Sequence, residues 1–159
     1  MITYKLLRMK NGKLYPLYVE ADRELPIGEW LNAQIGPKAD ETHVKARISG
    51  GQLSLRPGFH STDVPFADWI GTRVGDKLYQ RPTDVWCECE VTGNQMQVSD
   101  RNGLRSLPDG WYFFKTNTKQ IRPWIISDRI KINKILTEQE VYDICRSMGV
   151  EAQPVLAAC

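Results

Sequence analysis

Long apolar runs are missing from this chain. None of its stretches approaches the roughly 20 consecutive apolar residues that a helix needs to cross a bilayer. Its first residues, MITYKLLRMKNG, lack the hydrophobic centre of a signal peptide and have the pattern of a strand. We therefore expect a protein of the cytoplasm that makes no membrane contact.

An excess of charge of one sign is also missing. The 159 residues include 21 Lys and Arg against 19 Asp and Glu, which leaves a formal net charge of +2. Nucleic-acid-binding domains usually carry a pronounced basic excess, so this balance argues against DNA or RNA as the partner. If the chain were a nucleic-acid-binding accessory protein, its contacts would come from Arg56, Arg73, Arg81, Arg101 and Arg105.

Histidine and cysteine are too few and too scattered for a metal site. The two histidines are His43 and His60, and the cysteines Cys87 and Cys89 are followed only by two distant single ones. This spacing matches no zinc pattern, so we expect no metal and reduced structural cysteines. The sequence also lacks the serine-nucleophile, P-loop and dinucleotide-binding glycine motifs.

Most of the remaining pattern is typical of short strands. Asn11-Gly12 predicts a hairpin between strands at 2–9 and 14–19, and Pro16 should place the second strand at an edge. The alternation in VWCECEV predicts a strand over 85–91, and WYFFK, WII and IKINKIL predict strands at 111–115, 124–126 and 130–136.

Helices are fewer. Thr137 and Glu140 form a capping-box pattern in front of a helix over 138–147, and further short helices are expected at 25–36 and 64–70. The sequence therefore predicts one α+β domain over 1–150 with a tail at 151–159, built of mostly antiparallel strands in a split or two-sheet arrangement with two or three short helices. We expect the tryptophans at 30, 69 and 124 in the core and those at 86 and 111 partly exposed.

The segment RPGFHSTD concentrates polar groups at the end of an expected strand. Arg56 could hold a phosphate or a carboxylate, and His60 could act as a base, a hydrogen-bond donor or a stacking surface for a ring. Alternatively, His60 only fixes the turn and Arg56 forms a surface ion pair. The other candidate ligand contacts are Gly58, Ser61, Thr62, Asp63, Lys115 and Asn117.

Glu88 and Glu90 are two residues apart in an expected strand, so their side chains should lie on the same face. Two neighbouring carboxylates raise each other's pKa when they are buried, which suits acid–base catalysis. On an exposed face they are only a solvated pair, and both interpretations stay open.

The order of these segments resembles the PARP-like branch of the ADP-ribosyltransferase superfamily. The residues that carry the resemblance are Gly58-Phe59-His60 with Ala67-Asp68-Trp69, then Glu90-Val91, then LPDG with Lys115, then WIISD with Lys131-Ile132. The resemblance implies an ADP-ribosyltransferase-like fold and NAD as the cofactor. It aligns His60 with a tyrosine position that stacks on a ring.

The chain is also similar, nearly as far as Val150, to modules in the large polyvalent proteins of phages and mobile elements. The matching pieces are KLYPLYV, PIGEWLNA, RPGFH, VPFADWIG, VWCECE and GWYFFKTN. This second resemblance implies a bacteriophage or mobile-element protein that works in the host cytoplasm.

The three positions of the transferase triad are changed, because Pro16, His60 and the pair Arg122-Pro123 stand where the family has His, Tyr and Glu. Two outcomes are open within this interpretation: the domain binds NAD or a related nucleotide without transfer, or it uses a rearranged set of His60 with Glu88 or Glu90. The alternative function is a non-enzymatic anti-defence protein that binds and inhibits a host protein.

Overall fold

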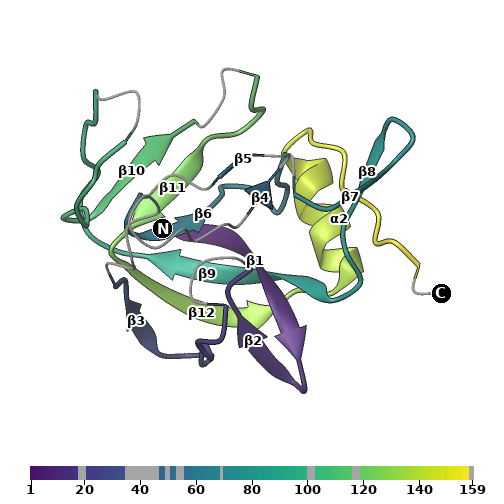
Figure 1. Ribbon diagram of the computed structural model, residues 1–159, viewed down its shortest axis with the longest axis horizontal. Helices are drawn as coiled ribbons and strands as arrows, with labels where there is room; N and C mark the ends of the chain where they lie inside the picture. The colour runs from purple at the N-terminus through teal and green to yellow at the C-terminus, as the bar shows by residue number, and fades with distance from the viewer. Residues whose placement is uncertain are drawn as a thin grey trace.

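The computed structural model describes residues 1–17, 21–34, 47–48, 51–52, 56–68, 70–99, 103–115 and 119–157. Most of the described chain is antiparallel strand (Figure 1). The elements are β1 (Ile2–Lys10), β2 (Lys13–Tyr15), β3 (Trp30–Asn32), β4 (Arg47–Ile48), β5 (Gly51–Gln52), β6 (Phe59–Ser61), β7 (Thr72–Val74), β8 (Lys77–Tyr79), β9 (Asp84–Val91), β10 (Trp111–Phe114), β11 (Trp124–Ser127), β12 (Arg129–Ile135) and α2 (Glu138–Ser147).

A five-stranded sheet, here called the large sheet, has the order β2-β1-β9-β12-β3 with every neighbour antiparallel. Its first hairpin turns at Asn11 and Gly12, whose φ angles of 54° and 75° give the left-handed turn that the sequence predicts. Pro16 follows β2 directly, and β2 is an edge strand of the sheet. The missing N–H of the proline therefore costs the sheet no ladder bond.

A three-stranded sheet, here called the small sheet, has the order β10-β11-β6. It joins the large sheet in two places. Strands β11 and β12 follow each other across Asp128, and Tyr4 of β1 exchanges two backbone hydrogen bonds, of 2.7 and 2.8 Å, with Thr62 just after β6. The sequence therefore correctly predicts mostly antiparallel strands in more than one sheet. The described residues form two further two-stranded sheets, β4-β5 and β7-β8, beside the large and the small sheet.

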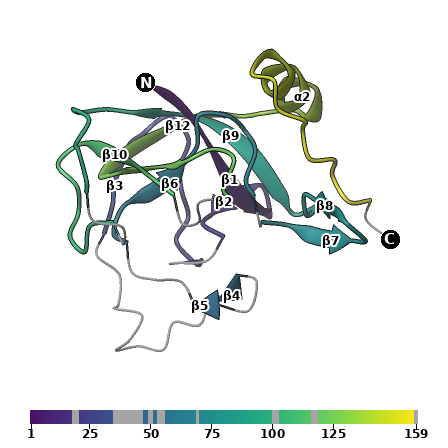
Figure 2. The same ribbon diagram turned by 90° about the horizontal axis from the view of Figure 1, so that it is seen from above.

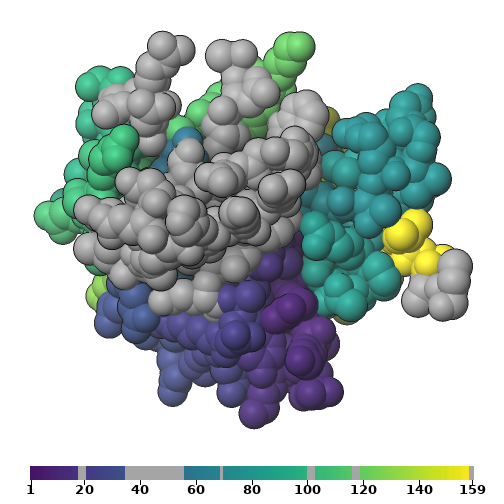
Figure 3. Space-filling model, in the orientation of Figure 1, coloured from purple at the N-terminus to yellow at the C-terminus, as the bar shows by residue number. Residues whose placement is uncertain are grey.

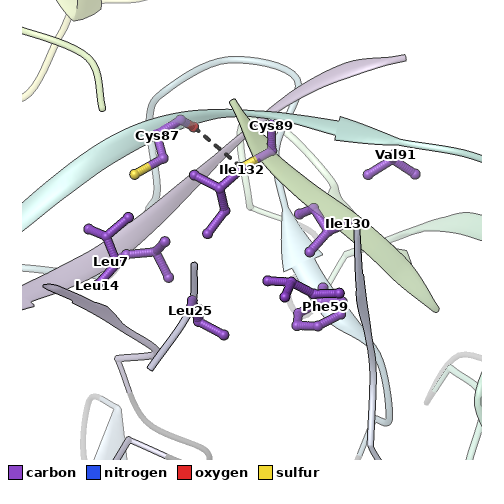
Figure 4. Close-up of a cluster of buried hydrophobic side chains, with 10 residues drawn as sticks. Leu7, Leu14, Leu25, Phe59, Cys87, Cys89, Val91, Ile130 and Ile132 are labelled. Atoms are coloured by element: carbon purple, nitrogen blue, oxygen red, sulfur yellow. Dashed lines mark hydrogen bonds between the residues drawn. The ribbon is translucent and has the colours of Figure 1, made fainter. Parts of the chain in front are cut away.

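The main core lies between the two sheets. Leu7, Cys87, Cys89 and Ile132 project from one face of the large sheet, and Phe59 of β6 packs against the same cluster (Figure 4). The alternation predicted for VWCECEV is confirmed, because Cys87 and Cys89 point into this core while the glutamates between and after them point to the other face.

Helix α2 packs on the opposite face of the large sheet. Val141 and Cys145 of the helix form a second cluster with Leu6 and Trp86. The capping box is present as predicted: the Glu140 N–H donates to the Thr137 hydroxyl, and the Glu140 carboxylate accepts from the Thr137 N–H. Figure 2 shows α2 on one side of the molecule and β4–β5 on the other.

The C-terminal segment runs beside the β7–β8 hairpin. Gln80 donates its backbone N–H to Pro154 and accepts from the Leu156 N–H, which makes a parallel bridge between Gln80 and Val155. In Figure 3 the last described residues, in yellow, lie against the teal atoms of this part of the molecule. Residues 154–156 are therefore held by the hairpin through backbone hydrogen bonds.

The helix expected at 25–36 is wrong for the described residues 25–34. Within this segment the helix is expected to begin after Gly28, but residues 30–32 form strand β3, which pairs with β12. Leu31 is buried whereas Trp30 and Asn32 are exposed, so the burial follows the two-residue period of a strand. Residues 35 and 36 lie outside the described part.

The helix expected at 64–70 is also wrong where the structure describes it. The Phe66 N–H donates to the carbonyl of Val64, two residues earlier, rather than to one four residues earlier. Val64, Pro65 and Ala67 are buried without helical hydrogen bonding. Trp69 lies outside the described residues. In the described part of the chain, α2 is therefore the single helix, where the sequence predicts two or three.

Two tryptophan assignments are also wrong. Trp30 is 37% exposed on an edge strand, whereas Trp86 is 2% exposed between β9 and α2. Burial here depends on which face α2 covers, and the sequence of the strand does not reveal that.

Candidate functional site

The turn before β6 requires glycine at position 58. Gly58 has a φ of 128°, and a Cβ there would come within 2.7 Å of the Ile126 side chain and 3.0 Å of the Ser127 carbonyl. The backbone of the Pro57-Gly58 turn therefore lies directly against β11. Gly58 has a packing role that explains its presence and that needs no ligand.

His60 lies in the middle of β6 and pairs with Ile126 of β11. Its ring meets Trp124 edge to face, with ring centroids 5.8 Å apart. Burial, followed by the positive charges of Lys5 and Arg56, lowers the pKa of His60 to about 3, although a hydrogen bond to the Gly58 backbone acts in the opposite direction. The imidazole is therefore neutral at pH 7, and its low pKa makes it a weak general base.

Arg56 lies on the same face of the small sheet as His60. Its guanidinium carbon is 4.3 Å from the centroid of the Phe114 ring, a stacked cation–π arrangement. Burial lowers the pKa of Arg56, and the hydroxyl of Tyr112 acts against this change. Phe114 is the register partner of Trp124, so the rings and the cation share one face.

Ser61 and Thr62 are buried, and their hydroxyls point to backbone carbonyls. The Ser61 hydroxyl is 3.5 Å from the Ile125 carbonyl, and the Thr62 hydroxyl reaches the carbonyls of Tyr4 and Val64. These two residues, expected as ligand contacts, therefore hold β6 against its neighbours.

Asp63 and Arg122 form an ion pair in which Oδ1 and Nε are 3.4 Å apart, and both side chains are about one-third exposed. Asp63 thus engages a residue from the loop before β11. Lys115 is exposed just after β10. Asn117 lies outside the described residues, as does His43.

Glu88 and Glu90 are not brought to His60. Both accept hydrogen bonds of 3.2 Å from the side-chain amide of Asn133, and Lys131 pairs with Glu90 at 3.6 Å. They lie on the face of the large sheet that points away from the main core and Phe59. The groups that act on His60 include neither carboxylate.

The arginines considered for nucleic-acid contact are dispersed. Arg56 stacks within the small sheet, and Arg73 donates to the carbonyl of Asp76 in the β7–β8 hairpin. Arg101 lies outside the described residues. Arg56 and Arg73 therefore lie at two different sheets.

The described cysteines are buried free thiols. Burial raises the pKa of Cys87 and of Cys89 to about 12 and that of Cys145 to about 11, so all three are protonated at neutral pH. Within the residues that the structure describes, no three His, Cys, Asp or Glu side chains gather as a metal site would require.

Lys5 is the site residue that the sequence reasoning missed. Its Nζ donates a 2.6 Å hydrogen bond to the His60 carbonyl, which links β1 to β6. The available signal was its position, because Lys5 alternates with Thr3 and Leu7 on the inward face of β1. A lysine at an inward position of a strand needs a partner for its ammonium group.

Comparison of the chain with protein-family models, with curated proteins and with solved structures found no match. In the part of the chain that the structure describes, no helix is long and apolar enough to cross a membrane.

Proposed function

We propose that this domain binds NAD or a related nucleotide on the face of the small sheet that carries His60. The observation that supports this proposal is the grouping of a neutral imidazole, the Trp124 ring and the stacked guanidinium of Arg56 on one face. The segment order that resembles ADP-ribosyltransferases, and the mostly antiparallel strands, point in the same direction.

Each of these groups suits one part of a nucleotide. An aromatic side chain can stack on a base, and stacking contributes about 1–3 kcal/mol per base. A guanidinium can hold phosphate oxygens through two parallel hydrogen bonds. A neutral imidazole carries one donor and one acceptor. The Gly58 backbone engages the ring N–H of His60, so its other ring nitrogen can accept a hydrogen bond from a ribose hydroxyl.

The proposal is one of binding without ADP-ribosyl transfer. A transferase needs a carboxylate beside the ribose, but Glu88 and Glu90 are engaged by Asn133 and neither acts on His60. The rearranged set of His60 with either glutamate therefore receives no support from the geometry.

Isothermal titration calorimetry with NAD, ADP-ribose and adenosine tests this proposal. We expect the wild-type domain to bind NAD and ADP-ribose, and the Trp124→Leu and His60→Ala variants to bind them at least fivefold more weakly, the lower limit for loss of one stacked base. Trp111→Phe is the matched control, since Trp111 lies on the opposite face of the small sheet and packs against the main core. If the folded wild type takes up no nucleotide at millimolar concentration, the proposal is wrong.

A second function, binding and inhibition of a host protein, is favoured by a different surface. The part of the large sheet that α2 leaves uncovered carries exposed apolar side chains, with Ile2 45% and Trp30 37% exposed. Arg129 and Lys131 lie over the Trp30 ring at 5.1 and 5.3 Å. Tryptophan and arginine are two of the residue types that are enriched at the centre of protein interfaces.

Affinity capture from a host lysate separates the two functions. If the chain is an inhibitor, a stoichiometric partner is retained by the wild type and by His60→Ala but is lost with Trp30→Ala. Loss of the partner with His60→Ala, and its retention with Trp30→Ala, would contradict an interface at Trp30.

A further inference from the structure

Strands β1 and β6 separate immediately beside the candidate site. Tyr4 and Thr62 exchange both of their backbone hydrogen bonds, and in the described residues the pairing of these two strands stops there. In an antiparallel ladder, alternate residues direct their carbonyls to the same side. The carbonyl of His60, two residues before Thr62, therefore points toward β1 but has lost its backbone partner.

The side chain of Lys5 replaces the missing ladder bond. Its Nζ donates to the His60 carbonyl at 2.6 Å across the gap between the two strands. This bond satisfies two groups at once, because an unpaired carbonyl and an unpaired ammonium are both costly away from water. Because the donor is a charged side chain, the bond also brings a positive charge next to β6.

The surroundings of Lys5 make this charge effective. Lys5 pairs with Cys87 of β9 in register and shares the inward face of β1 with Leu7. Burial lowers the pKa of Lys5 to about 8, with the thiols of Cys89 and Cys87 acting in the opposite direction. In such surroundings a charge is weakly screened, so it acts on the nearby imidazole.

We propose that Lys5 is the positioning residue of the His60 site, where its ammonium group holds β6 in place and sets a positive charge next to the strand that carries the imidazole. Lys5 acts on His60 from β1, and Arg56 acts on it from the turn before β6. The ligand part of this inference rests on the proposed nucleotide function, whereas the effect of Lys5 on His60 does not.

The test is a titration of the His60 imidazole by NMR in the absence of ligand, with His60→Gln to assign the resonance. In Lys5→Met we expect the midpoint of His60 to rise by roughly one pH unit, the usual effect of removing a like charge at close range. Lys5→Arg keeps the charge and should leave the midpoint unchanged. Lys10→Met, at the exposed end of the same strand, removes one positive charge elsewhere and should also leave it unchanged.

Lys5→Gln separates the charge from the hydrogen bond, because it keeps an N–H donor but has no charge. It should raise the midpoint as Lys5→Met does, and it provides the same measurement if Lys5→Met does not fold. A midpoint that stays at the wild-type value in a folded, uncharged variant would overturn the inference. A mere structural role for Lys5 would also leave the midpoint in place.

NAD titrations of the same proteins, from neutral pH downwards, distinguish this inference from the proposed function. If NAD binds, the acidic limb of its affinity profile should move in Lys5→Met by the same shift as the His60 midpoint, and an unmoved limb contradicts the role of Lys5 in ligand binding. If the wild type binds no NAD, the proposed function fails while the imidazole titration still decides whether Lys5 controls His60.

Discussion

At the scale of single residues, His60 is defined by what surrounds it rather than by the polar residues next to it in sequence. The hydroxyls of Ser61 and Thr62 donate to backbone carbonyls, and Asp63 pairs with Arg122. The groups that act on the His60 ring are Trp124, Arg56 and Lys5. A histidine with two cations near it and no carboxylate acting on it stays neutral. This neutral state is what makes a binding role more consistent with the site than proton transfer.

The neutral state of His60 predicts how stability depends on pH. Its pKa is about 3 in the folded protein and near 6.5 in the unfolded chain, so the unfolded state takes up the proton first as pH falls. The stability that neutral His60 contributes is fully present above pH 6.5 and is lost progressively between pH 6.5 and 3. For one proton, the free energy of unfolding falls by at most about 1.4 kcal/mol per pH unit. Urea denaturation at several pH values should show a shallower acidic loss in His60→Gln than in the wild type.

Comparing the two proteins removes the contributions of the carboxylates and of His43, which are present in both. Parallel stability curves for His60→Gln and the wild type would mean that His60 takes up its proton equally well in the folded state. Burial by the surrounding sheet would then be less complete than the structure shows.

At the scale of elements, the Pro57-Gly58 turn and the Asn11-Gly12 hairpin show two different uses of glycine. Both need a positive φ, but only Gly58 is pressed against another strand. The hairpin is recognisable from its own sequence because the turn requirement is local. The contact of Gly58 with β11 joins residues far apart in the chain, so the sequence did not reveal it.

Gly58→Ala should destabilise the domain by roughly 3 kcal/mol or more, because the added methyl group meets Ile126 and the Ser127 carbonyl in addition to the backbone strain. Gly75→Ala is the matched control. Gly75 has a φ of 67° with open space around its Cβ position, so only the backbone term of about 1 kcal/mol applies. Urea denaturation measures both. Equal losses in the two variants would show that the turn can move away from β11.

At the scale of the whole molecule, the candidate site depends on the packing of the small sheet against the large one. Phe59 links the two sheets, since it belongs to β6 but packs in the core of the large sheet with Leu7 and Ile130. His60, the next residue, points to the other side. A substitution that removes the packing of Phe59 is therefore expected to shift β6, the strand that carries His60.

Phe59→Ala should cost about 3–5 kcal/mol, the usual loss for a buried phenylalanine, and should weaken any ligand binding at His60 in parallel. Phe113→Ala, in β10 of the same sheet, should cost much less because Phe113 is 43% exposed. Thermal and urea denaturation followed by far- and near-ultraviolet circular dichroism provide the measurement. If Phe59→Ala costs no more than Phe113→Ala, the two sheets do not depend on this contact.

The sequence by itself determined the features that repeat over a few residues. The alternation of β9, the Asn11-Gly12 turn and the capping box of α2 are set by backbone geometry and neighbouring side chains, and each is present as predicted. The helix expected over 25–34 failed because tertiary pairing with β12 outweighed a weak local pattern.

Tertiary structure alone decided which of the candidate residues meet. It placed Glu88 and Glu90 beside Asn133 and Lys131, apart from the groups that act on His60, and it brought Lys5 across 55 positions of sequence to the His60 carbonyl. Strand alternation fixes which side chains share a face of one strand, but the choice of neighbouring strands depends on burial over the whole chain. The polar segment at 56–63 could therefore be found from the sequence, whereas its partners could not.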